Sequence, residues 1–141
     1  GTGRPGGCAA RSSLNCRFRH WERRMNEEMV IFTRTFDFID WLIPRTISFP
    51  RSQRFVVTRR LQDAALDFYE RILEANNCRG RARMRKLRQA DANLDKVRHY
   101  LRLALRWDWL SSGQYRHAAE MVAELGRLLG GWIKQTKGAS G

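Results

Sequence analysis

Residues 79–107 read RGRARMRKLRQADANLDKVRHYLRLALRW and carry apolar side chains spaced three or four positions apart. This spacing puts those side chains on one face of a helix, so the segment is predicted to form one long amphipathic helix. The predicted face comprises Met84, Leu87, Ala90, Leu94, Val97, Leu101 and either Ala104 or Leu105. Asn76, Asn77 and Gly80 predict a tight turn just before it, so this helix is expected to pack antiparallel to the preceding one.

The helix before that turn is predicted to start near Pro50 and to end near Asn77. Proline suits the first turn of a helix because its missing N–H would have no partner there. Ser48 is the expected N-cap. The seam of this helix mixes apolar and polar positions: its predicted members are Phe55, Arg59, Gln62, Leu66, Tyr69, Leu73 and Asn76, with Ala65 and Ile72 beside them.

Two further helices are predicted. The first covers about residues 28–42 and is expected to stop at Pro44. The last begins at Ser111, because Ser111 and Gln114 have the spacing of a capping box. The stripe of the first is Phe32, Thr35, Phe36, Ile39, Leu42 and Ile43. The stripe of the last is Tyr115, Ala118 or Ala119, Val122, Leu125, Leu128 or Leu129, and Trp132 or Ile133.

Four helices joined by short links predict an all-α fold, an antiparallel up-down-up-down four-helix bundle over residues 25–137. No stretch alternates polar and apolar residues for long enough to indicate a sheet. Residues 1–24 are rich in Gly, Ser and Arg and are expected to be a basic leader that is disordered or not native. Residues 138–141 are expected to form a flexible tail.

The composition narrows the possible environments and partners. Lys and Arg total 27 against 14 Asp and Glu, a net charge of +13, which favours RNA, DNA or an anionic membrane surface as a partner. No apolar run is long enough to span a membrane, and no membrane partner is expected. Cys8, Cys16 and Cys78 form no CxxC pair, which argues against a disulfide framework or a zinc site and favours the reducing cytoplasm.

No catalytic or cofactor motif stands out in the sequence. His117 and Glu120 share a helical face, but they occur in the reverse of the metal-binding Glu-x-x-His order and without a second copy. A phosphate-binding glycine loop and a nucleophile signature are both absent from the sequence. The chain is therefore not expected to be an enzyme, and it is not expected to bind a metal or a cofactor.

The strongest local signal is a basic cluster at the start of the long helix. It comprises Arg79, Arg81, Arg83, Arg85, Lys86 and Arg88, and Lys96, Arg98 and Arg102 extend it along the helix. Six cations in ten residues repel one another, and positive charge is disfavoured at a helix N-terminus. A polyanion would relieve both penalties. The cluster therefore predicts a nucleic-acid or polymerase contact, with a solvated charged face as the alternative.

Two other groups of residues each have two interpretations. Trp107, Trp109 and Trp132 could stack on bases, but large aromatic residues near helix ends more often close a bundle core, so they are interpreted as structural. Arg59 and Arg60 fall on or beside the predicted seam. They are expected to pair with aspartates within a turn of the same helix or to meet another subunit.

Several motifs in order resemble a known family. They are FPRSQRF at residues 49–55, EAN at 74–76, LRQA at 87–90 and GRLLGGW at 126–132. Over about residues 31–134 the chain resembles the accessory variability determinants of diversity-generating retroelements, which are four-helix proteins. Bundle proteins encoded in ribosomal RNA intervening sequences share the fold and some motifs, and a protein of that branch, of undefined role, is the alternative.

The resemblance implies a non-catalytic protein that assembles into a homopentameric barrel. Such a protein binds the retroelement reverse transcriptase and its template RNA, and possibly cDNA or DNA, and supports mutagenic cDNA synthesis. The motif residues Pro50, Arg51, Ser52 and Arg54 are assigned to helix initiation or subunit contact. Residues 1–24 have no counterpart in the family pattern.

Overall fold

A computed structural model describes Arg19 and residues 29–140 of the chain. The leader expected over residues 1–24 lies outside the described residues, apart from Arg19. The contacts divide the chain into Gly1–Val30 and Ile31–Gly141, and the bundle lies in the second unit.

Four long helices make up the bundle, and the first of them begins two residues before this second unit. The first helix covers residues 29–46. A short 3₁₀ turn (Arg51–Gln53) and a π-helical turn (Arg54–Thr58) lead into α2 (Arg59–Asn76). The other two helices are α3 (Gly80–Arg106) and α4 (Ser112–Ser140).

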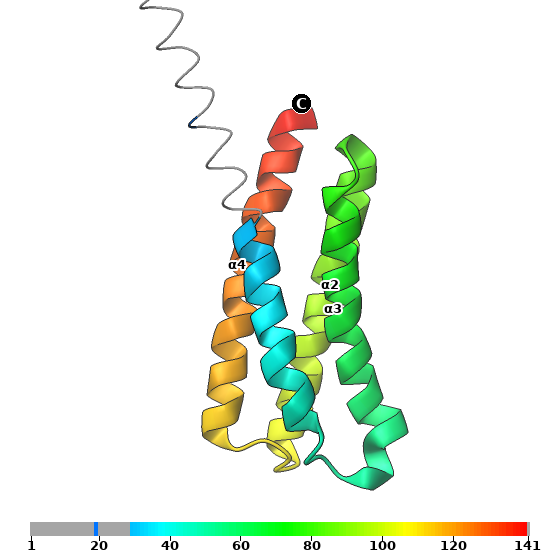
Figure 1. Cartoon of the computed structure of the whole chain (residues 1–141), viewed down its shortest axis with the longest axis vertical. Coiled ribbons are helices and arrows are strands. Elements are labelled where there is room, and N and C mark those ends of the chain that lie inside the picture. The colour runs from blue at the N-terminus through cyan, green and yellow to red at the C-terminus, as the bar shows by residue number, and fades with distance from the viewer. Residues whose placement is uncertain (1–18, 20–28, 141) are drawn as a thin grey trace, which may run out of the picture. The chain divides into compact units, whose positions relative to one another are not determined.

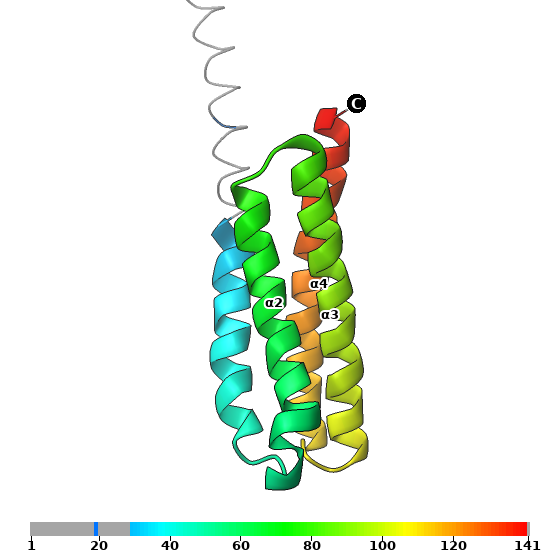
Figure 2. The ribbon, with the colours of Figure 1, turned by 90° about the vertical axis from the view of Figure 1, so that its right-hand side faces the viewer.

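The helices run alternately up and down, and each packs beside two others. The links into α2 and α4 lie at one end of the bundle and the α2–α3 turn at the other (Figure 1). Figure 2 shows the first helix beside α2, and α3 lies against both α2 and α4. No strand occurs among the residues that the structure describes. The predicted all-α, up-down-up-down bundle is confirmed.

The core confirms the predicted faces of α3 and α4. Leu87, Ala90, Leu94, Val97, Leu101 and Ala104 are buried on α3, and Ala118, Val122, Leu125, Leu129 and Trp132 on α4. Both α3 and α4 carry mostly charged or small residues away from the core. Burial of apolar area therefore selects one orientation for each helix.

The predicted seam of α2 was wrong. Its core face comprises Leu61, Ala64, Ala65, Phe68, Ile72 and Ala75, while Phe55, Arg59, Leu66, Leu73 and Asn76 are exposed. Burying the predicted seam would have taken Arg59 and Asn76 out of water, which costs free energy for unpaired polar groups. The observed face avoids that cost and leaves Leu66 and Leu73 outside.

The first helix also differs from prediction in its face and its end. Phe38 is 2% exposed, whereas Phe36, which was expected in the core, is 59% exposed. The helix continues past Pro44 to residue 46. It ends where Ser48 Oγ donates a hydrogen bond to the carbonyl of Arg45 (2.9 Å). Ser48 therefore belongs to the end of the first helix and is not the N-cap of the next.

The α2–α3 turn and the start of α4 have the glycine and the capping box that the sequence predicted. Gly80 has φ +57°, a conformation that favours glycine, and it follows directly on the α2–α3 turn. At the start of α4, the Ser111 N–H donates to Gln114 Oε1 (3.0 Å) and the Gln114 N–H donates to Ser111 Oγ (3.1 Å). The predicted capping box is confirmed.

Removing the capping hydroxyl should weaken the bundle measurably. Ser111→Ala is expected to lower the free energy of unfolding by about 1 kcal/mol, because the Gln114 N–H loses its partner. Urea denaturation followed by circular dichroism would measure the change. Ser112→Ala is the matched control, since Ser112 is exposed and lies next in the chain. Equal stability of the two variants would contradict the capping role.

Candidate nucleic-acid interface

The positive charge of the bundle is concentrated on α3. This helix carries nine Lys and Arg against two Asp, whereas α2 carries three basic and four acidic residues. On α4 there are four basic and two acidic residues. One helix therefore dominates the electrostatic character of the bundle.

Most of these cations share the face of α3 opposite the core. At 100° per residue, they fall within about a third of the helix circumference. All six are exposed, and we call them the basic stripe: Arg81, Arg85, Arg88, Lys96, Arg102 and Arg106. From Arg81 to Arg106 the stripe extends about 37 Å along the helix axis. No ion pair holds any of the six within the part of the chain that the structure describes.

Arg83, predicted as a binding residue, points the other way. Its Nε donates to the carbonyl of Ala75 in the last turn of α2 (3.0 Å) and to the carbonyl of Cys78 in the turn that follows (2.8 Å). Its guanidinium also lies 5.8 Å from the ring centroid of Trp132. Because the last carbonyls of a helix lack partners within it, Arg83 caps α2 and ties it to α3 and α4.

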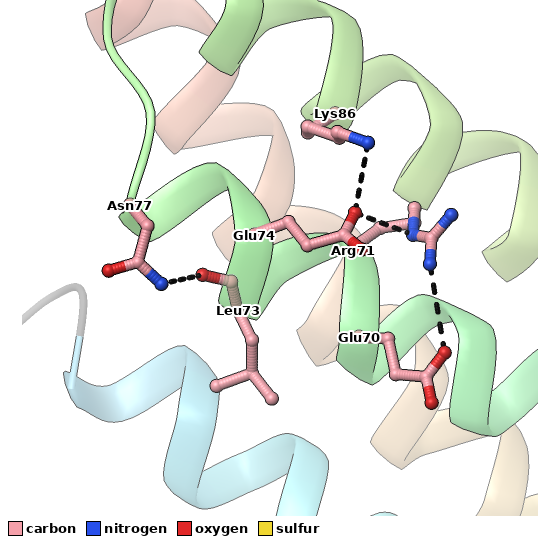
Figure 3. Close-up of polar contacts among 6 residues, drawn as sticks. All are labelled: Glu70, Arg71, Leu73, Glu74, Asn77 and Lys86. Atoms are coloured by element: carbon pink, nitrogen blue, oxygen red, sulfur yellow. Dashed lines mark hydrogen bonds and ion pairs between the residues drawn. The ribbon is translucent and has the colours of Figure 1, made fainter.

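The side chain of Lys86 forms an ion pair with Glu74. Glu74 Oε2 of α2 forms ion pairs with Lys86 Nζ (3.1 Å) and with Arg71 Nε (3.0 Å) (Figure 3). Arg71 also approaches Glu70, at 3.6 Å. The side chains of Lys86 and Glu74 are only 32% and 40% exposed, so this contact joins α2 to α3 and neutralises Lys86.

Of the other predicted binding residues, some are held by a partner within the bundle and others are not. Arg98 pairs with Asp95 (2.6 Å) and lies so close to α4 that a Cβ at Gly126 would overlap its guanidinium. Arg79, the residue before α3, is exposed and has no pair among the described residues. Of the nine predicted binding residues, Arg79, Arg81, Arg85, Arg88, Lys96 and Arg102 therefore have no ion-pair partner within the described part of the chain.

The start of α3 adds to the attraction for anions. Its first turn contains no acidic residue. The free N–H groups there carry partial positive charge, to which the nearby arginines add. The sequence predicted this basic cluster, but it did not indicate that Arg83 and Lys86 are held by partners near the end of α2.

The other residues with two interpretations are also placed. Trp132 is buried, and Phe49, Trp109 and Trp107 form a chain of ring contacts (5.3 and 5.1 Å) that closes one end of the bundle. Arg59 approaches Asp63 at 3.8 Å with both side chains largely exposed.

The described residues hold neither a cluster of metal ligands nor a membrane span. Within them, no three His, Cys, Asp or Glu side chains come together as metal ligands would. None of their helices has the length and apolar character needed to cross a membrane.

A family model described as bAvd-like matches residues 29–136. The chain belongs to the bAvd-like family. The match covers all four helices of the bundle and confirms the predicted kinship with accessory variability determinants. The motif residues that suggested this kinship lie in this bAvd-like chain around the 3₁₀ and π turns before α2, at the end of α2, on α3 and on α4.

A solved structure supports the fold of the bAvd-like chain independently. It is a protein of unknown function from the S23 ribosomal protein family of Bacteroides thetaiotaomicron, with a TM-score of 0.70 and 20% sequence identity. The alignment covers 77% of this chain and 98% of that one. At this identity the likeness establishes the bundle fold alone. No curated protein matches the chain.

Proposed function

We propose that this bAvd-like protein is a non-catalytic accessory protein of a diversity-generating retroelement. In this role it binds the reverse transcriptase and its template RNA in the cytoplasm and supports mutagenic cDNA synthesis. Family membership supports the accessory role. The observation that carries the RNA contact is the basic stripe on α3, six exposed cations along a single rigid helix.

The stripe fits a phosphate backbone for physical reasons. Its cations have no carboxylate partners among the described residues, so bringing them together costs electrostatic free energy in the free protein. Each phosphate that an arginine neutralises relieves part of that repulsion and releases condensed counterions. Contacts with the backbone position an RNA without selecting its sequence, which suits a protein that presents a template to a polymerase.

The first helix and α2 supply a different kind of surface, which we assign to self-assembly into a pentamer. Phe36 is 59% exposed, and Leu66 and Leu73 are 40% and 41% exposed. Phe55 and Val56, in the π turn before α2, are 76% and 52% exposed. Exposed apolar side chains of this size on two neighbouring helices, and on the turn before one of them, favour subunit contact. The stripe on α3 would then stay available for RNA and polymerase.

Co-purification tests this proposal directly. The full chain, expressed with the adjacent reverse transcriptase and template RNA, is expected to retain both, and light scattering is expected to give the mass of five subunits. Treatment with ribonuclease separates a direct polymerase contact from one bridged by RNA. Failure to retain the polymerase at low salt, where electrostatic attraction is strongest, would contradict the proposed function.

A further inference from the structure

A groove runs between α3 and α4 beside the C-terminal half of the basic stripe. It contains two hollows, of about 410 and 560 Å³, that share His99, Arg102 and Tyr115. Toward the middle of the bundle, the first hollow continues over Ala119 and Ala123 of α4. The second continues toward Arg106 of α3. These volumes fall within the usual range for small-ligand pockets, about 300–1,000 Å³.

The groove is hollow because α4 presents small side chains there. Ala119 and Ala123 face the cations of α3 across it, and Leu101 and Val122 form part of its apolar lining. Tyr115 is half-buried and lines both hollows, so an aromatic ring lies where they meet. The groove therefore combines apolar and aromatic surface with open space.

The charge of the lining is entirely of one sign. Arg102 lines both hollows, Arg98 lines the first and Arg106 lines the second, and His99 adds an imidazole that can form hydrogen bonds. The residues that line the two hollows include no Asp or Glu. Asp95 pairs with Arg98, and no ion pair holds Arg102 or Arg106 within the described part of the chain. The groove is therefore complementary to an anion that also carries a flat apolar part.

An unpaired nucleotide has this combination of properties. Proteins that bind single-stranded RNA combine a positive groove along the backbone with aromatic side chains on which bases stack. A base within a duplex is already stacked and paired, so it cannot enter a side groove without being extruded. Arg102 and Arg106 belong to both the stripe and the groove, so an RNA chain on the stripe passes the mouth of the groove.

We propose that the α3–α4 groove holds an unpaired nucleotide of the bound RNA. Its base lies against Tyr115 in the space above Ala119 and Ala123, and its phosphate meets Arg102 and His99. This inference rests on the proposed function, because it assumes that the stripe binds RNA. It adds a preference for single-stranded over duplex RNA at one end of the stripe.

Filling the groove without changing charge tests this assignment. The full chain is titrated into a fluorescent uridine oligomer of about 12 nucleotides, a length typical of single-strand binding sites. An abasic chain of equal length and a hairpin duplex serve as comparison ligands. Ala123→Leu places a larger side chain in the hollow. Gly130→Leu, two turns along on the same side of α4, is the control, because a Cβ there meets no atom within 4 Å.

Ala123→Leu is expected to weaken binding of the uridine oligomer at least about fivefold, the lower end of what the loss of one base stack costs. Binding of the abasic chain and the duplex should not change, and Gly130→Leu should bind like the wild type. Tyr115→Leu, checked for helicity by circular dichroism, should show the same selective loss. Because Ala123 is exposed, its variant tests the groove even if Tyr115→Leu does not fold.

The possible outcomes distinguish a failure of the groove assignment from a failure of the proposed RNA contact. If reversing the stripe charges abolishes binding while Ala123→Leu binds the uridine oligomer like the wild type, the groove holds no base and the proposed function stands. An equal loss for abasic and base-carrying chains would also overturn the groove assignment, because the lost contact would not involve a base. If the wild type binds none of the three ligands at low salt, the proposed RNA contact itself fails.

Discussion

Reversing Arg81, Arg85, Arg88 and Arg102 to Glu is expected to weaken RNA binding by between about 10² and 10³ at about 0.1 M salt. Each phosphate contact with a single strand changes the slope of log K against log salt by about 0.7. Four lost contacts therefore make the slope of log K against log salt shallower by about 3. At about 0.1 M salt, one decade below 1 M, the same change in slope lowers log K by about 3 at most. All four side chains are exposed and make no ion pair among the described residues, so the variant should keep its fold.

A matched variant separates the stripe from net charge. Arg116, Arg127, Lys134 and Lys137 are also exposed but lie on α4. Reversing them changes the net charge by the same amount and is expected to cost no more than about tenfold, through the general field alone. Fluorescence anisotropy at several salt concentrations measures both variants. Equal losses and equal slopes would mean that total charge, and not its place on α3, governs the affinity.

Replacing Phe38 by Ala is expected to lower the free energy of unfolding by about 3–5 kcal/mol. The ring is 2% exposed and belongs to the core cluster, so its removal leaves a cavity as well as losing buried apolar area. Urea denaturation of dilute protein would measure the change. A loss near the upper end would leave little of the stability of a domain of this size.

Phe36, two positions earlier, provides the comparison. It is 59% exposed, and Phe36→Ala is expected to change the free energy of unfolding by less than about 1 kcal/mol. The two substitutions remove the same atoms from the same helix, so their difference reports orientation alone. A larger effect at Phe36 than at Phe38 would place the other face of the first helix against the core.

Sequence patterns predicted α3 and α4 well because their two faces differ in chemistry. Outside its core face, α3 carries mostly Arg, Lys, Asp and Gln, so only one orientation buries an apolar stripe. The first helix has no such contrast. Apolar residues occupy positions 29–32, 36, 38, 39 and 41–43 and surround the helix, so periodicity cannot choose between Phe36 and Phe38.

On α2 the ambiguity has another origin. Two apolar sets repeat with the same period, one through Phe68 and Ile72 and the other through Leu66 and Leu73. Only the packing of neighbouring helices decides which set is buried, and that information is not local. A surface set of this kind is also what a subunit interface would need, so the two roles look alike in sequence.

The candidate site was predicted as a region but not side chain by side chain. Arg83 and Lys86 belong to the same run of cations as Arg81 and Arg85 and differ from them only in direction. Their partners, the last carbonyls of α2 and Glu74, lie across the turn. Which cation faces a partner depends on how α2 ends relative to α3, a relation that no spacing within one helix encodes.

The concentration of cations on α3 also bears on how fast the protein would find the RNA that we propose it binds. With nine basic residues on this helix and a slight acidic excess on α2, the bundle carries a permanent electric dipole across its width. A polyanion exerts a torque on such a dipole before contact and turns α3 toward itself. A larger fraction of encounters then has the correct orientation for binding. Association is therefore expected to approach the diffusion limit at low ionic strength.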